Sequence, residues 1–84
     1  MNILFTQHAW EEFHYWQKTD KKTIHKINEL IKAISRTPFE GVGKPEPLRG
    51  NLQGFWSRRI SQEHRLVYRI EDGVITIVQC RFHY

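Results

Sequence analysis

Cysteine is almost absent from this chain of 84 residues, which carries a single one at position 80. An internal disulfide is therefore excluded, and an unpaired thiol is typical of reducing compartments, so we expect a cytoplasmic protein. No apolar run approaches the roughly 20 residues that a membrane-spanning helix needs, so no membrane segment is predicted. The apolar stretch at residues 1–5 is also too short for a secretion signal.

Metal-binding patterns are missing as well. Five histidines are present, but no Cys-x-x-Cys or His-Glu-x-x-His arrangement collects them, so we expect neither a metal site nor a cofactor. Acidic residues are the minority among the charged ones: 13 Lys and Arg against 9 Asp and Glu give a formal net charge of +4. This balance favours a polyanionic partner, either a nucleic acid or an acidic protein segment.

Two amphipathic helices are predicted after a short strand at residues 2–5. Thr6 can cap the first helix, over residues 7–18, by accepting a hydrogen bond from a free backbone N–H of the first turn. Its apolar stripe contains three aromatic residues, and Glu12 is expected on the opposite, solvent-exposed side. Asp20 can cap the second helix, which Thr37-Pro38 ends because proline disfavours helical geometry in the residue before it. The short connection predicts a helical hairpin.

The second half of the chain reads as a loop followed by three strands. Residues 41–50 are dense in glycine and proline and predict the loop. Strands are predicted at residues 55–60, 64–70 and 74–83, and Asp72-Gly73 is a strong hairpin signal between the last two. The order β-α-α-β-β-β predicts one α+β domain over residues 1–84. Its sheet would be mostly antiparallel and twisted, with the helical hairpin on one face.

Alternation along the strands assigns side chains to the two faces of this sheet. Arg65 falls opposite the apolar set of its strand. In the last strand, the even-numbered residues, including Cys80, are expected under the helices, and the odd-numbered ones, including His83, on the open face. Pairing of the two strands would bring Arg65 and His83 together, with Glu46 at the rim of the same surface.

A carboxylate, a guanidinium, an imidazole and the phenol of Tyr84 would then surround one shallow basic groove. Such a set can cleave RNA without a metal. A base removes the ribose 2′-OH proton, a cation stabilises the phosphate oxygens, and an acid protonates the leaving 5′-oxygen. The residues alone leave open whether Glu46 or a neutral His83 is the base.

Six segments of the chain form a recognisable pattern: KINELIK (residues 26–32), RTPFEG (36–41), GKPEPL (43–48), GFWSRRI (54–60), EHRLVY (63–68) and CRFHY (80–84). Together they resemble the Txe/YoeB toxins of the RelE superfamily of bacterial type II toxin–antitoxin systems. The resemblance covers nearly the whole chain with the same spacing. Two departures are mild: Phe82 stands where a tyrosine is expected, and Arg49 where a lysine is expected.

The resemblance implies a microbial RNase-like fold and an mRNA interferase that cuts the message in the ribosomal A site. By position, Glu46 would be the general base and His83 the general acid. Arg65 would stabilise the phosphate in the transition state, and Tyr84 would orient or assist at the phosphate.

The same resemblance extends to binding residues and partners. Candidates for RNA binding are Lys44, Arg49, Arg58, Arg59 and Arg81. Glu63 would support Arg65 or Arg59. A YefM-like antitoxin would be the inhibitory partner, operator DNA would be bound through the antitoxin complex, and a toxin homodimer is compatible with the family pattern.

Two other functions are also compatible with this scaffold. A ParE-like toxin would bind a protein target such as DNA gyrase, and it would have no use for the set of Glu46, Arg65, His83 and Tyr84. A non-catalytic RNA- or ribosome-binding module would need only the arginines, and it predicts that His83→Ala keeps full activity in cells.

Overall fold

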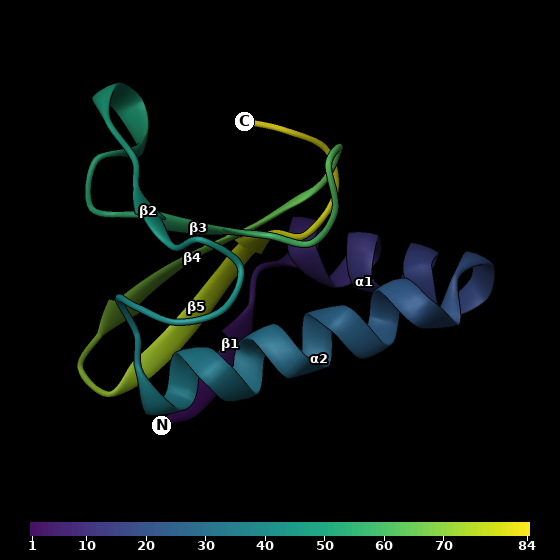
Figure 1. The fold of residues 1–84 in the computed structure, drawn as a ribbon, viewed down its shortest axis with the longest axis horizontal. Coiled ribbons are helices and arrows are strands. Elements are labelled where there is room, and N and C mark those ends of the chain that lie inside the picture. Colours follow the sequence, from purple (N-terminus) through teal and green to yellow (C-terminus); the bar gives the residue numbers. More distant parts are fainter.

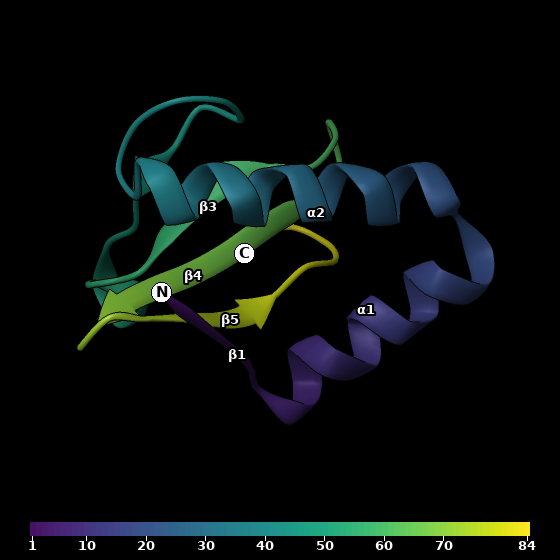
Figure 2. The ribbon, with the colours of Figure 1, turned by 90° about the horizontal axis from the view of Figure 1, so that it is seen from below.

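Five strands and two helices form two layers in the computed structural model, which describes residues 1–84 (Figure 1). The elements are β1 (Asn2–Phe5), α1 (Gln7–Thr19), α2 (Lys21–Arg36), β2 (Glu46–Pro47), the 3₁₀ helix η1 (Gly50–Leu52), β3 (Trp56–Arg59), β4 (Arg65–Glu71) and β5 (Val74–Gln79). The sheet order is β1-β5-β4-β3-β2, and only β1 and β5 are parallel. The predicted α+β class, the mostly antiparallel sheet and the helical hairpin on one face are confirmed (Figure 2).

Both helices begin where the capping residues predict. The Thr6 hydroxyl accepts from the backbone N–H of Ala9 at 3.2 Å. The Asp20 carboxylate accepts from the backbone N–H groups of Lys22 and Thr23 and from the Thr23 hydroxyl. These bonds, above all those from Thr23, hold the pKa of Asp20 below its usual value because they favour the ionised form. Neither helix is long and apolar enough to cross a membrane.

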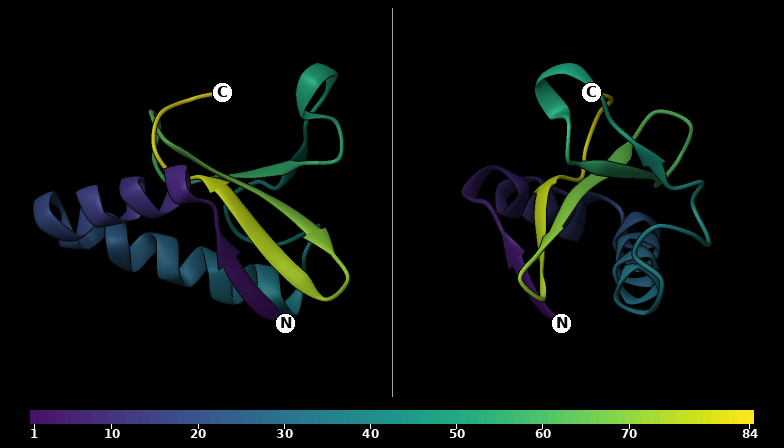
Figure 3. Two further views of the ribbon diagram at one scale, coloured as in Figure 1. Left: turned by 180° about the vertical axis from the view of Figure 1, so that it is seen from behind. Right: turned by 90° about the vertical axis from the view of Figure 1, so that its left-hand side faces the viewer.

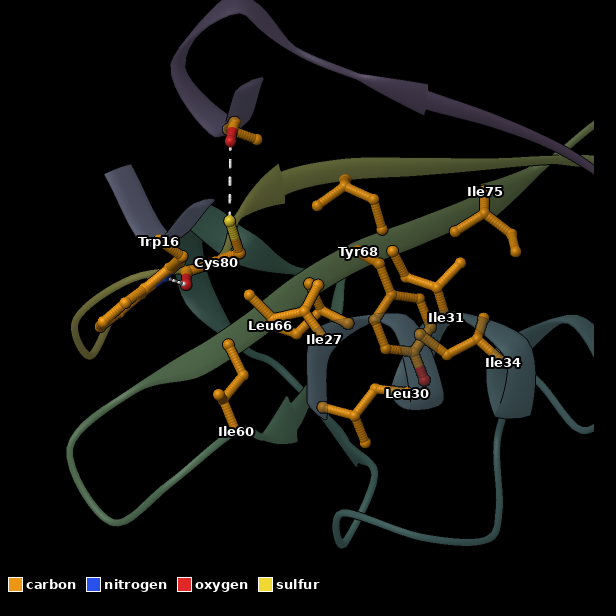
Figure 4. Packing of buried hydrophobic residues seen from close by; sticks show 12 residues of the cluster. Trp16, Ile27, Leu30, Ile31, Ile34, Ile60, Leu66, Tyr68, Ile75 and Cys80 are labelled. Atoms are coloured by element: carbon orange, nitrogen blue, oxygen red, sulfur yellow. Dashed lines mark hydrogen bonds between the residues drawn. The ribbon is translucent and has the colours of Figure 1, made fainter. Parts of the chain in front are cut away.

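The hydrophobic core lies between the helices and one face of the sheet (Figure 4). Its α2 side chains are four residues at helical spacing, and β4 and β5 supply the opposing layer. The cluster comprises Ala9, Trp16, Ile27, Leu30, Ile31, Ile34, Ile60, Leu66, Tyr68, Ile75, Ile77 and Cys80. Burial of each large apolar side chain contributes about 1.5–3 kcal/mol, so this layer holds the helices on the sheet.

The last strand differs from its prediction in length and in the assignment of faces. β5 ends at Gln79 instead of continuing to residue 83. Ile75 and Ile77, expected on the open face, are fully buried in the core. A β-bulge explains the error, because Tyr68 pairs with Ile77 and Val67 with Gln79, which leaves Val78 as an extra residue. The extra residue reverses the alternation, so Gln79 still reaches the open face and the prediction for it is correct.

The loop predicted at residues 41–50 contains a short strand that the sequence pattern does not reveal. Glu46 pairs with Ser57 and Pro47 with Trp56, so β2 forms an edge of the sheet. Proline is acceptable at such an edge because the outer side needs no N–H donor. Gly43 has φ +85°, and a Cβ there would lie 2.9 Å from Leu30 Cδ2. The loop can therefore pack close to α2 before it enters β2.

Candidate active site

The five residues after β5 form a tail that begins beside α1 at Cys80 and ends on the face of the sheet away from the helices. Figure 3 shows the C-terminus on the same side as η1, above β3 and β4. Phe82 adopts φ +65°, a left-handed conformation that turns the chain after Arg81. The backbone N–H of Arg65 donates to the Phe82 carbonyl at 3.0 Å, so the turn is joined to the start of β4.

Cys80 is the point from which the tail departs, and α1 holds it from two sides. Trp16 Nε1 donates to the Cys80 carbonyl at 2.8 Å, and the Cys80 backbone N–H donates to Glu12 Oε1 at 2.8 Å (Figure 4 shows the Trp16 contact). Glu12 is buried, so its predicted place on the solvent side of α1 is wrong. Its carboxylate satisfies a backbone donor that burial would otherwise leave unpaired.

The Cys80 thiol is fully buried, as predicted. Burial raises its pKa to about 12, and the nearby Glu12 carboxylate adds to the effect. A thiol with so high a pKa stays protonated at neutral pH, so it is an inert packing group and no nucleophile.

Tyr84 and Glu46 meet at the far end of the tail. The Tyr84 hydroxyl lies 3.3 Å from Glu46 Oε1 and 3.2 Å from the Ser57 hydroxyl. Glu46 and Ser57 are partners in the β2–β3 register, so their side chains leave the sheet on the same face. The expectation that Glu46 borders the same surface as the chain terminus thus holds in this structure.

Arg65 lies on the open face beside the turn of the tail. Its Nη1 donates to three backbone carbonyls of the β3–β4 connection, those of Ser61, Gln62 and His64. These bonds fix the guanidinium in place, and the residue as a whole is only 8% exposed. Nε and Nη2 bond to no other group of the protein, and neither is fully shielded from solvent. That edge of the fork is available to an anion.

His83 lies between these two groups in the tail and is exposed. Its ring is 5.5 Å from the Tyr84 ring, measured between centroids. The predicted set is therefore distributed along one path on the open face. The backbone N–H of Arg65 bonds to the Phe82 carbonyl, His83 is the next residue, and the Tyr84 hydroxyl contacts the Glu46 carboxylate.

Arg58 and Arg59 have opposite environments although they are neighbours. Arg58 is fully buried and donates to the Tyr68 hydroxyl and to the carbonyls of Thr37, Glu40 and Val42. The prediction that Arg58 binds RNA is therefore wrong, because no part of it reaches the surface. Arg59 is exposed on the same face as Arg65, its partner in the register.

The other predicted RNA-binding residues come from three segments: the loop before β2, the loop after β2, and the tail. Lys44 is exposed beside β2, and Arg49 helps to line a hollow of about 460 Å³ together with Pro47, Leu48, Gln53 and Gly54. Arg81 is half-buried, with its guanidinium 3.6 Å from the centre of the Tyr15 ring. Glu63 is exposed, and no ion pair joins it to Arg65 or Arg59, so the predicted support is absent.

Several residues that build the site escaped the sequence reasoning. Ser57 contacts Tyr84, and His64 accepts the Phe82 backbone N–H on Nδ1 at 2.7 Å. Gln79 Nε2 donates to three carbonyls of the tail. All three depend on the turn at Phe82, and no pattern in the sequence indicates that turn.

Comparison with known proteins identifies the family. Residues 5–84 match the family described as YoeB-like toxin of bacterial type II toxin-antitoxin system. The chain is 57% identical to Toxin YoeB of Escherichia coli K12, over the full length of both chains. It is also similar to two solved structures from Staphylococcus aureus. Each alignment is 52% identical and covers 100% of this chain and 98% of the Staphylococcus aureus chain. They are a heterotetrameric YoeB-YefM toxin-antitoxin complex, with a TM-score of 0.93, and a YoeB dimer, with a TM-score of 0.94.

A match over nearly the whole chain, with this level of identity and the same fold, leaves one assignment. The chain belongs to the YoeB-like toxins of bacterial type II toxin–antitoxin systems.

Proposed function

We propose that this toxin is a ribosome-dependent mRNA endoribonuclease that cuts the message in the ribosomal A site and so inhibits translation. The observation that carries the proposal is the contact between Tyr84 and Glu46, which brings the end of the chain to a carboxylate on β2. Through this contact a carboxylate, a phenol and an imidazole lie along one exposed path that begins at Arg65.

The proposed reaction uses these side chains in sequence. The Glu46 carboxylate takes the proton from a ribose 2′-OH, and the 2′-oxygen attacks the adjacent phosphorus. The bond from phosphorus to the 5′-oxygen breaks, and protonated His83 gives its proton to that oxygen. The products are a 2′,3′-cyclic phosphate and a free 5′-OH. The free edge of Arg65 stabilises the charge on the non-bridging oxygens, and Tyr84 orients Glu46.

Dependence on the ribosome follows from the shape of the site. The proposed catalytic groups lie on an open face, and His83 and Tyr84 are exposed. An exposed site of this kind offers few contacts that could hold a flexible RNA in line for attack, and positioning supplies much of the rate in such reactions. The ribosome would supply that positioning, with Lys44, Arg49, Arg59 and Arg81 binding the backbone of the RNA.

The partners proposed for this chain follow from its charge and its relatives. A related toxin is found in complex with YefM, and another as a dimer. We extend both to this chain: a YefM-like antitoxin, acidic and partly disordered when free, would fold on the basic surface and block the site. Operator DNA would be bound through the antitoxin, a toxin homodimer would form by analogy, and the toxin would act in the cytoplasm on translating ribosomes.

The test is primer extension on a defined message in a purified translation system. Wild-type protein should produce discrete A-site cuts, and His83→Ala should lose them. His25→Ala is the matched control, because His25 is an exposed histidine on α2 that pairs only with Glu29. Translation arrest without cuts, or arrest unchanged in His83→Ala, would show a binding inhibitor and contradict the enzymatic proposal.

A further inference from the structure

Gln79 occupies the same rung of the sheet as the proposed general base. In the register, Glu46 pairs with Ser57, Ser57 with Val67, and Val67 with Gln79. Paired residues project to the same face, so these four side chains form a row across β2, β3, β4 and β5 on the open face. Glu46 is at one end of the row and Gln79 is at the other.

The tail contacts both ends of this row. Val67, in the middle, is only 1% exposed although it faces away from the helices. At the β2 end, Tyr84 contacts both Glu46 and Ser57. At the β5 end, the tail departs immediately after Gln79.

The amide of Gln79 binds the inside of the turn. Its Nε2 donates to the carbonyl oxygens of Arg81 at 3.0 Å, Phe82 at 3.3 Å and His83 at 3.2 Å. Three successive carbonyls converge on one nitrogen only when the chain curls around it, and Phe82 is left-handed for this reason. A left-handed residue that is not glycine is strained, so the amide compensates for a conformation that the tail would not adopt by itself.

Apart from the contacts of the Tyr84 hydroxyl with Glu46 and Ser57, the other contacts of the tail stop short of His83. Trp16 and Glu12 hold Cys80, Tyr15 stacks on Arg81, and His64 binds the N–H of Phe82. Gln79 alone among the surrounding side chains bonds to the backbone of His83. It therefore controls the direction in which the last two residues leave the turn.

Direction matters because the end of the tail must still cross most of the row. The row from β5 to β2 spans three inter-strand distances, about 14 Å at about 4.8 Å each. The turn keeps the carbonyls of residues 81–83 at the Gln79 end of the row. The side chain of Tyr84 therefore reaches Glu46 only if the chain leaves the turn toward β2.

We infer that Gln79 is a positioning residue, whose amide aims His83 and Tyr84 across the open face toward Glu46. The inference rests on the proposed function, since it assigns those two residues to the reaction. Gln79 itself touches no reacting atom in this arrangement. Its amide hydrogens are both engaged by the tail, so it acts only through the geometry of the residues that follow it.

The experiment compares wild type with Gln79→Ala, which removes the amide, and Gln79→Glu, which keeps the shape but replaces the donor with an acceptor. Gln17→Ala is the control, because Gln17 is exposed on α1 and its amide bonds to no other residue. The first readout is backbone ¹⁵N relaxation of Phe82, His83 and Tyr84 in the free protein. The second is single-turnover cleavage on programmed ribosomes at increasing toxin concentrations, with thermal unfolding as the check on the fold.

Both Gln79 variants should show fast motion at residues 82–84 while the sheet stays rigid. Their rate at saturation should fall about 10- to 100-fold, in line with a displacement of about 1 Å at the reacting groups, while the half-saturating concentration stays the same. Gln17→Ala should match wild type. An ordered tail in Gln79→Ala, a mobile tail with an undiminished rate, or a change confined to half-saturation would overturn the inference.

Failure of the proposed function would look different. If wild type does not cut the message at all, the catalytic proposal falls. The relaxation measurement then still decides whether Gln79 orders the tail, because it does not depend on cleavage.

Discussion

The phenolic oxygen of Tyr84 lies 3.3 Å from Oε1 of Glu46, although the two residues are 38 positions apart in the chain. The contact joins the last residue of the tail to the edge strand of the sheet. It thereby brings together on the open face side chains from β4, the tail and β2, which no single element carries. The Ser57 hydroxyl, at 3.2 Å, holds the same phenol from below.

Tyr84→Phe should lower the cleavage rate about 10- to 100-fold, because a hydrogen bond to a charged group contributes about 1.5–3 kcal/mol. The ring and its packing remain, so the effect reports the hydroxyl alone. Ser57→Ala is the comparison: it removes one partner of the phenol but keeps the contact with Glu46, so its loss should be smaller. Single-turnover cleavage on ribosomes measures both. A larger loss in Ser57→Ala would show that the contact with Glu46 is not the important one.

Glu46→Gln should lower the rate about 10²- to 10⁴-fold if Glu46 is the general base. A base must be deprotonated, so the wild-type rate should fall on the acidic side as this carboxylate takes up a proton. In the variant that acidic limb should disappear, since the amide does not titrate. The pH–rate profile measures it. A limb that persists in Glu46→Gln and disappears in His83→Ala would instead assign the base to His83.

Arg58→Ala should destabilise the fold by about 3 kcal/mol or more, because it removes a fully buried side chain together with its bonds to the Tyr68 hydroxyl and to three loop carbonyls. Arg59→Ala should change stability by no more than about 0.5 kcal/mol, since that side chain is exposed. Urea unfolding of the two variants gives the comparison. The cleavage rate should show the reverse order. Arg59→Ala should stay folded but cleave more slowly, because it binds RNA more weakly. Equal stability losses would contradict the structural role of Arg58.

These neighbouring arginines show what the sequence could predict and what it could not. The helices, their caps, the hairpin at Asp72-Gly73 and the class of fold follow from local patterns, and all are confirmed. Alternation along β3 already places Arg58 on the side of Trp56, toward the core. A charge is tolerated there only because a distant loop supplies carbonyls, and no local pattern contains that information.

The tail is the other part that could not be predicted. Local apolar and β-branched residues favour a strand to the end of the chain, but the bulge at Val78 and the contacts of Cys80 with α1 end it early. Those contacts join residues 64 and 68 positions apart. The identities of the proposed catalytic residues were accessible from the sequence, whereas the side chains that hold them in place were not.

Trp16→Phe should cost about 1–3 kcal/mol of stability, since the Cys80 carbonyl loses its buried donor. Trp10→Phe is the matched control, because Trp10 is 43% exposed and its ring nitrogen bonds to no other group. Chemical unfolding gives the difference, and hydrogen exchange at residues 80–82 should accelerate only in Trp16→Phe. Equal losses in the two variants would mean that ring packing, and not the N–H group, accounts for the effect.

Stability should decline in alkaline solution because of Cys80. Burial raises the pKa of its thiol to about 12, whereas an unfolded chain releases this proton near pH 8.5, about the value of free cysteine. Between those two values the folded state holds the proton and the unfolded state does not. The free energy of unfolding should therefore fall as the pH rises, by up to about 1.4 kcal/mol per pH unit from this group. Urea unfolding from pH 8 to pH 10.5 measures the slope, and Cys80→Ala should have a shallower one.

The buried thiol should also resist iodoacetamide at pH 8 until urea unfolds the chain. Equal slopes in the two proteins, or rapid labelling of the folded one, would show that the thiol is not shielded as the structure indicates.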